Sequence, residues 1–201
     1  MKRIVIVDYG LGNLRSVYRG LEKSGARPVV TFDIEEIAAA DAIVLPGVGA
    51  FRDGMEQIGE MQQVLTEAAG AVPMLGICLG MQMLLEWSEE HGLHAGLGII
   101  PGTVRRFQGS PGYKIPHMGW NSLESPMTDH PLMEGIREGS YVYFVHSYYA
   151  DTRAENTLTS TTYTRSFASS ITSGNVYGVQ FHPEKSGATG LRILENFIGL
   201  I

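Results

Sequence analysis

The only cysteine of the chain, Cys78, lies in a segment that is typical of an exposed nucleophile. It is the central residue of GICLG at residues 76–80, and it directly follows an apolar run, residues 72–77. A sharp turn from strand to helix needs small residues two positions before and after its centre, because larger side chains would clash. The turn would expose the thiol at the carboxyl edge of a sheet, where ligands bind in doubly wound folds. The alternative is a buried core thiol, which is common for free cysteines.

A thiol needs a base, and one histidine is suitably placed for that role. Of the six histidines, His182 alone is followed two residues later by a carboxylate, Glu184, with Pro183 between them. Residues i and i+2 of an extended chain project to the same side, so Glu184 could hold the imidazole in one tautomer. A helix N-terminus and a nearby imidazolium would together lower the pKa of a thiol from about 8.5. An exposed turn with an incidental His and Glu is the alternative.

Other uses of these residue types find little support in the sequence. There is no HExxH segment and no Cys/His pair at ligand spacing, so we expect no metal and no cofactor. The segment DYGLG at residues 8–12 lacks the full G-x-G-x-x-G spacing of a nucleotide loop.

The composition restricts the class of protein further. The chain has 201 residues, 44% of them apolar, which suits a single domain over residues 1–201. Its net charge is -6 without a basic run, which disfavours nucleic-acid binding. One cysteine excludes an intrachain disulfide, and the apolar run at residues 4–7 is too short for a signal peptide or membrane span. We therefore expect a cytoplasmic protein.

The first half of the chain alternates between strand and helix patterns. This alternation predicts an α/β fold: a doubly wound, mostly parallel sheet with helices on both faces. The predicted strands cover residues 2–7, 28–32, 41–45 (stopped by Pro46) and 72–77, and the predicted helices cover residues 13–24 (ended by Gly25), 33–40, stretches up to 69, and 79–87.

The second half of the chain has a different sequence pattern. Short β-branched or aromatic segments predict antiparallel strands packed onto the first half, as an extension of the fold. They cover residues 98–100, 141–149, 158–163 and 176–181, and a final helix is predicted at residues 189–198.

Two segments of the chain, which contain Cys78 and His182, resemble motifs of the class I glutamine amidotransferases. Residues 76–82 (GICLGMQ) and 178–186 (GVQFHPEKS) match the two triad motifs of that family without a gap. Four further stretches resemble the branch that serves imidazole glycerol phosphate synthase in histidine biosynthesis. These are residues 8–14 (DYGLGNL), 46–51 (PGVGAF), 116–121 (PHMGWN) and 143–148 (YFVHSY), which span the chain in order.

The resemblance implies a glutaminase triad. Cys78 would attack the carboxamide of L-glutamine to form a thioester, His182 would transfer protons, and Glu184 would orient His182. The family pattern also implies a set of residues for the amino-acid end of the substrate, namely Gln82 with the backbone around Gly47, Gly49, Leu79, Ser147 and Tyr148.

An acyl-transfer site also needs donors for the developing oxyanion. The backbone N–H of Leu79 is one candidate, and the segment from Gly47 through Val48 to Gly49 is the other. Val48 departs from the smaller residue usual in this class, which makes a flip of that peptide less free. Our hypothesis is that the oxyanion hole is completed only when a partner binds.

The resemblance further implies a partner, a (β/α)₈-barrel synthase that receives the ammonia and makes imidazole glycerol phosphate and an aminoimidazole carboxamide ribonucleotide. No barrel sequence is present in these residues, so we expect a separate polypeptide and a heterodimer. Residues 113–121 read as a loop with aromatic and Met side chains, which are enriched at interface centres. The expected interface residues are Pro116, His117, Met118, Trp120 and Asn121, with Asn13 and Lys185 as weaker candidates.

Two other readings stay open at this stage. The chain could serve a different synthase of the same class, although PGVGAF and PHMGWN favour the first branch. It could also be a redox member of a similar fold that uses Cys78 as a sensor thiol. That reading leaves the segment from His182 to Glu184 unexplained.

Overall fold

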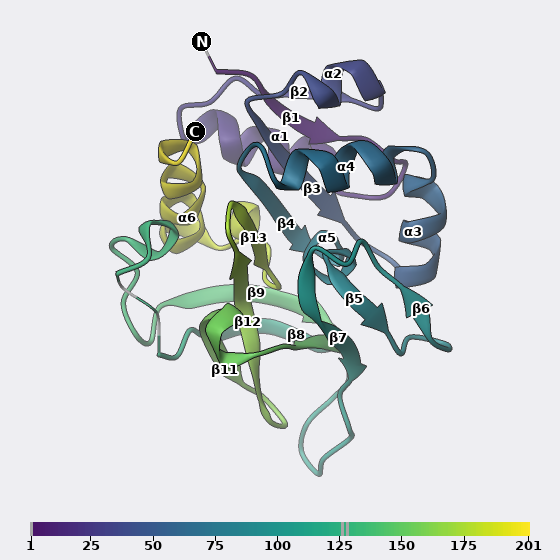
Figure 1. The fold of residues 1–201 in the computed structure, drawn as a ribbon. Helices are drawn as coiled ribbons and strands as arrows, with labels where there is room; N and C mark the ends of the chain where they lie inside the picture. The colour runs from purple at the N-terminus through teal and green to yellow at the C-terminus, as the bar shows by residue number, and fades with distance from the viewer. Residues whose placement is uncertain (1, 126, 128) are drawn as a thin grey trace.

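The computed structural model describes residues 2–125, 127 and 129–201. Within them, eleven strands form one sheet and two more form a separate small sheet (Figure 1). The strands are β1 (Ile4–Val7), β2 (Val29–Thr31), β3 (Ala42–Gly47), β4 (Met74–Cys78), β5 (Leu85–Ser88), β6 (His94–Ala95), β7 (Ile100–Arg106), β8 (His117–Ser122), β9 (Tyr141–His146), β10 (Tyr148–Asp151), β11 (Thr157–Thr162), β12 (Ser166–Ser173) and β13 (Val176–Val179). The α-helices are α1 (Leu14–Lys23), α2 (Ile34–Ala38), α3 (Phe51–Ile58), α4 (Met61–Ala69), α5 (Leu79–Met83) and α6 (Gly187–Gly199), and the 3-10 turns are η1 (Pro131–Met133), η2 (Ala154–Asn156) and η3 (Pro183–Lys185).

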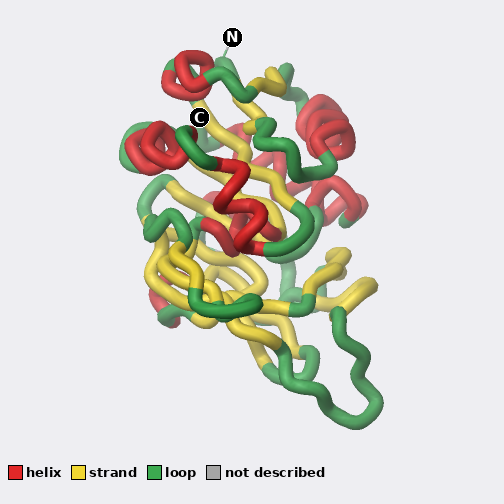
Figure 2. Tube along the Cα trace, turned by 90° about the vertical axis from the view of Figure 1, so that its right-hand side faces the viewer, coloured by secondary structure: helices red, strands yellow, loops and turns green. Residues whose placement is uncertain are grey.

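The first part of the large sheet is parallel and runs in the order β2-β1-β3-β4-β13. Helices lie on both sides of it (Figure 2), which confirms the predicted doubly wound α/β class. Alternate residues of β1 enter different cores: Ile4 and Ile6 pack with α1 and α6, whereas Val5 and Val7 pack with α2, α3 and α4. A strand that is buried on both faces has no polar side to show, so its sequence is continuously apolar.

The second part of the large sheet is mostly antiparallel, as predicted. Strand β13 is the junction, because it pairs parallel with β4 and antiparallel with β12. Its prediction as an antiparallel strand was therefore only half right. The strands β12, β10 and β7 continue the antiparallel order, β11 pairs with β12, and β5 lies parallel to β7.

Three local predictions were wrong for the same reason. The helix expected at residues 79–87 ends at Met83, because the chain then pairs with β7 as strand β5. Strand β3 continues through Pro46 to Gly47, in register with Cys78. Part of the loop expected at residues 113–121 is strand β8, which pairs with β9 along its whole length. In each case pairing with a distant strand overrides the local preference of the sequence.

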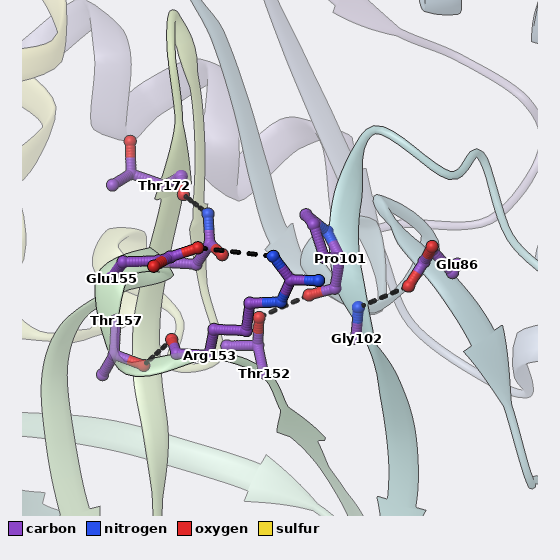
Figure 3. Close-up of polar contacts among 9 residues, drawn as sticks. Glu86, Pro101, Gly102, Thr152, Arg153, Glu155, Thr157 and Thr172 are labelled. Carbon is purple, nitrogen blue, oxygen red and sulfur yellow. Dashed lines mark hydrogen bonds and ion pairs between the residues drawn. The ribbon is translucent and has the colours of Figure 1, made fainter.

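Side-chain contacts hold the connection between β10 and β11 against its neighbours (Figure 3). The Thr152 hydroxyl donates to the Pro101 carbonyl of β7, and Asn156 Nδ2 donates to the Thr172 carbonyl of β12 at 2.8 Å. Thr157 Oγ1 donates to the Arg153 carbonyl at 3.1 Å. These contacts fix the far end of the antiparallel part. Among the helices of the described residues, none is both long and apolar enough to cross a membrane.

Candidate active site

Strand β4 delivers Cys78 into a strained turn, as the flanking glycines predict. Cys78 has φ +54° and ψ -108° and precedes helix α5 directly. A Cβ on Gly80 would overlap the carbonyl oxygen of Leu45, and one on Gly76 would lie 2.8 Å from the Gly80 backbone. Only glycine fits these two positions, so close packing around them holds the backbone of the cysteine in its unusual conformation.

The turn after β13 brings His182 and Glu184 to the same place. His182 Nδ1 lies 2.8 Å from Glu184 Oε1, and both side chains are almost fully buried. Ser186 anchors the turn, because its Oγ donates to the His182 carbonyl at 2.6 Å and accepts from Tyr143 N at 2.9 Å. The predicted pairing of His182 with Glu184 is therefore present, with the imidazole held by a carboxylate as a base requires.

The groups around His182 determine the pKa of its ring. Burial lowers the His182 pKa, but interactions with Cys78 and Glu184 outweigh burial and raise the pKa to about 9. The second ring nitrogen, Nε2, is buried and makes no well-aligned hydrogen bond within the described residues. We therefore attribute the influence of Cys78 on the ring to charge attraction. The arrangement favours a protonated imidazole at neutral pH.

One of two hydrogen-bonded glutamines also contacts the nucleophile. Gln180 Nε2 lies 3.7 Å from Cys78 Sγ, and Gln180 Oε1 accepts from Gln82 Nε2 at 3.0 Å. Gln82 Nε2 also donates to the Tyr148 carbonyl at 3.2 Å. Sequence reasoning predicted Gln82 and missed Gln180. Its position two residues before His182, on the same side of an extended chain, was the available signal.

A cleft of about 530 Å³ opens over the sulfur. Glu90 and Arg106, which sequence reasoning did not single out, add one carboxylate and one guanidinium to its lining. Most of the predicted substrate and oxyanion residues line this cleft together with Cys78 and His182, namely Val48, Gly49, Leu79, Gln82, Ser147 and Tyr148.

Gly47 does not line the cleft. It is buried below it, and a Cβ there would collide with the Tyr9 hydroxyl and lie 2.9 Å from Leu79 Cβ. Tyr9 in turn donates to the Pro46 carbonyl at 2.6 Å. Gly47 thus permits close packing beneath the turn, and its place among the substrate contacts stays a prediction.

The next segment forms the rim of the cleft. Val48 is 39% exposed, and Gly49 has φ +102°, a conformation that favours glycine. Glu90 fixes the far end of this segment, since its Oε2 accepts from Phe51 N at 2.6 Å. The segment between Gly47 and Phe51 is therefore anchored at both ends and exposed between them.

The side chains of strand β8 alternate between its two faces, so the predicted interface residues fall into an outward and an inward group. Met118 and Trp120 face outward, 62% and 56% exposed, whereas His117 is buried with 3% exposure. The prediction of His117 as an interface residue was therefore wrong, since the pleat of the strand turns it inward. Asn121 is half-buried on the same inward side, and Pro116 lines the cleft.

The outward side chains form one surface, which we call the aromatic face: Met118, Trp120, Tyr141, Tyr143 and Lys185. The Trp120 and Tyr143 rings lie 6.1 Å apart, and Lys185 Nζ lies 6.0 Å from the Tyr143 ring. Tyr141 is 60% exposed. Asn13 precedes α1, which packs against the η3 turn that carries Lys185.

Solved structures share this fold at low sequence identity. A protein from Thermoplasma acidophilum that is described as part of a GMP synthase has a TM-score of 0.75 and 22% identity, covering 100% of this chain and 94% of its own. The structure of PurLQS from Thermotoga maritima gives a TM-score of 0.76 at 20% identity, with 99% of both chains covered.

Sequence relatives are much more similar. The imidazole glycerol phosphate synthase subunit HisH of Methanosarcina acetivorans is 57% identical, over 98% of both chains. The subunit HisH of Archaeoglobus fulgidus is 47% identical, again over 98% of both. The sequence pattern of the family described as "Glutamine amidotransferase class-I" matches residues 5–200. The chain that places a strained cysteine beside a carboxylate-held histidine therefore belongs to the class I glutamine amidotransferase family.

Proposed function

We propose that this chain is the glutaminase subunit of an imidazole glycerol phosphate synthase. One observation carries the proposal: the cleft lined by the buried Cys78 is also lined by His182, whose ring is held by Glu184 at 2.8 Å. A core thiol or a sensor thiol needs no such carboxylate-held imidazole. The identity to HisH subunits supports the choice of this branch over other amidotransferases.

The reaction follows from the groups in the cleft. The sulfur anion of Cys78 attacks the carboxamide carbon of L-glutamine, the C–N bond breaks, and the imidazolium of His182 gives its proton to the departing amine. Ammonia and a thioester result. Water then attacks the thioester, His182 takes one proton from it, and the C–S bond breaks to release glutamate. Glu184 holds the ring in the orientation that both steps require.

The charges of the cleft suit the amino-acid end of glutamine. Glutamine carries an α-ammonium and an α-carboxylate, and the cleft offers the carboxylate of Glu90 and the guanidinium of Arg106. Gln82, Ser147 and Tyr148 would provide the neutral contacts. This complementarity in an enclosed site favours a free amino acid over a peptide or nucleotide.

The oxyanion would be bound by the backbone N–H of Leu79 and by the rim segment at Val48 and Gly49. The exposed rim leaves room for a partner to complete the hole, so we expect low glutaminase activity in the isolated chain. Equal rates of glutamine hydrolysis with and without the synthase subunit would contradict this part of the proposal.

The ammonia would pass to a separate (β/α)₈-barrel subunit in a cytoplasmic heterodimer that makes imidazole glycerol phosphate and the aminoimidazole carboxamide ribonucleotide. The aromatic face supports this docking, because exposed Trp, Tyr and Met side chains are typical of interface centres. Residues 1–201 would act as one domain, without cofactor or metal.

The test is covalent labelling with a diazoketone analogue of L-glutamine. In the presence of the synthase subunit, we expect one equivalent of label on Cys78 by mass spectrometry, protection by L-glutamine, and no label on the Cys78→Ser variant. Labelling that L-glutamine does not prevent, or none at all, would overturn the assignment.

A further inference from the structure

An uninterrupted series of side-chain hydrogen bonds connects strand β8 to the nucleophile. It begins where Asn121 Nδ2 lies 3.3 Å from His117 Nε2 and continues where His117 Nδ1 lies 2.9 Å from His146 Nε2. His146 Nδ1 is 2.7 Å from the Tyr148 carbonyl. From that carbonyl the series continues through Gln82 and Gln180 to Cys78 Sγ.

The direction of each hydrogen bond follows from the carbonyl oxygen of Tyr148, which lies in the middle of the series. A carbonyl only accepts, so His146 must donate from Nδ1 to the Tyr148 carbonyl, and its Nε2 becomes an acceptor. His117 must then donate from Nδ1, which leaves its own Nε2 to accept from Asn121. Both rings have one permitted tautomer, and the donors from His146 and from Gln82 converge on the Tyr148 carbonyl.

The charge state of the two rings agrees with these tautomers. Burial lowers the pKa of His117 to about 4 and the pKa of His146 to about 3. The charged or titratable groups near His146 are His117 and His182, which both lower its pKa further. Neutral rings cannot donate from both nitrogens, so the tautomers stay fixed across the neutral pH range.

The glutamine pair is oriented by the same carbonyl. Gln82 donates to both the Tyr148 carbonyl and Gln180 Oε1, so the amide nitrogen of Gln180 must face the sulfur. Gln180 has 0% exposure and Gln82 6%, so water cannot easily replace these bonds. A donor at 3.7 Å from Sγ limits where the sulfur can lie.

We propose that His117, His146 and Gln180 are positioning residues of a hydrogen-bonded relay, which joins at the Tyr148 carbonyl, holds the sulfur of Cys78 and ties its position to strand β8. None of the three needs to touch glutamine. The outer side of β8 carries Met118 and Trp120 of the aromatic face, so a partner docked there would press on the strand that begins the relay. The inference rests on the proposed function and adds a route by which docking would alter the nucleophile.

Alkylation of Cys78 by iodoacetamide tests the relay without glutamine. In the full-length chain, we expect His117→Phe to lower the rate constant at neutral pH about tenfold, since members of one hydrogen-bond network couple strongly. His117→Asn, which keeps a donor near the position of Nδ1, should restore the rate to within about threefold of the original. Phe167→Leu is the control for loss of packing, because Phe167 contacts the His146 ring but donates no hydrogen bond to it.

Two results would overturn the relay. One is an alkylation rate for His117→Phe equal to that of the original chain. The other is an equal decrease for the Phe and Asn variants, which would show a purely structural role. With the synthase subunit bound, the same His117→Phe variant should lower kcat for L-glutamine more than it changes KM.

A measurement on the unchanged protein does not depend on whether a variant folds. Nitrogen NMR of the histidine rings should show the Nδ1–H tautomer at both His117 and His146, and an Nε2–H tautomer at either would overturn the relay. If the His117 variants alkylate as expected but the original chain never hydrolyses glutamine or takes the diazoketone label, the proposed function fails and the relay stands.

Discussion

The turns that follow the neighbouring strands β4 and β13 place their functional groups by different means. After β4, backbone packing positions Cys78: strand β3 leaves no room for a side chain at Gly80. After β13, side-chain hydrogen bonds position His182 and Gln180. The nucleophile is thus held by contacts that cannot change without loss of the fold, whereas its activation depends on contacts that can be removed one at a time.

The largest expected effect tests the backbone side of this comparison. Gly80→Ala places a Cβ onto the Leu45 carbonyl, so we expect a loss of about 3 kcal/mol or more in the free energy of unfolding, with loss of activity. Urea denaturation measures it. Gly70→Ala is the control, because the nearest atom to its Cβ would be 3.8 Å away and Gly70 already has helical φ and ψ. Similar stability for both variants would remove the steric argument for the turn.

The next largest expected effect tests the side-chain hydrogen bonds that hold His182. Glu184→Gln removes the charge that holds His182 but leaves a group of the same size, so kcat for glutamine hydrolysis should fall about 100-fold or more while the free energy of unfolding changes little. Steady-state kinetics of the complex measures it. Glu195→Gln, which alters only an exposed ion pair with Arg192, should leave kcat unchanged.

The same variant predicts a shift in pH dependence. An imidazolium is the form present below its pKa, so steps that need protonated His182 should be lost as pH rises through about 9. Glu184 contributes to raising that pKa, so Glu184→Gln should move the alkaline limb of kcat/KM to lower pH. A limb that stays in place would show that Glu184 only orients the ring.

The sequence revealed the two sides of the site unequally. The turn at Cys78 was predictable, because its glycines lie within two residues of the cysteine and the reason for them is steric. The pairing of His182 with Glu184 was predictable for the same reason of short separation. The contact of Gln180 with Cys78 joins residues 102 positions apart, and the two-residue spacing from His182 was its only local signal.

The β8 strand shows the same limit for the fold. The sequence from Pro116 to Asn121 has aromatic, glycine and polar residues that read as a loop, and only its pairing with β9 makes it a strand. Once it is a strand, alternation sends His117 inward and Trp120 outward. The interface prediction therefore failed at His117 through a missing long-range pairing.

A smaller effect is expected on the binding of the synthase subunit at strand β8. Trp120→Ala should weaken binding of the synthase subunit by about 2 kcal/mol, about 30-fold in Kd, while the isolated chain keeps its stability, because Trp120 is 56% exposed. Isothermal titration calorimetry measures the affinity. Phe32→Ala is the matched control, since that ring is 73% exposed beyond the edge strand β2. An equal loss of affinity for both would mean that the aromatic face is not the docking surface.

The smallest effect comes from the far end of the antiparallel part, where side chains hold structure without reaching the cleft (Figure 3). Asn156 is 9% exposed and donates to the Thr172 carbonyl, so Asn156→Ala leaves a buried acceptor without its donor and should cost about 1 kcal/mol of stability. Arg153→Ala removes only an ion pair with Glu155, both side chains being about 70% exposed, and should change stability by less than about 0.5 kcal/mol. Both variants should keep the original kcat. A lower kcat in either would show that the site depends on hydrogen bonds far beyond the relay, and that the separation between structural and activating contacts is too sharp.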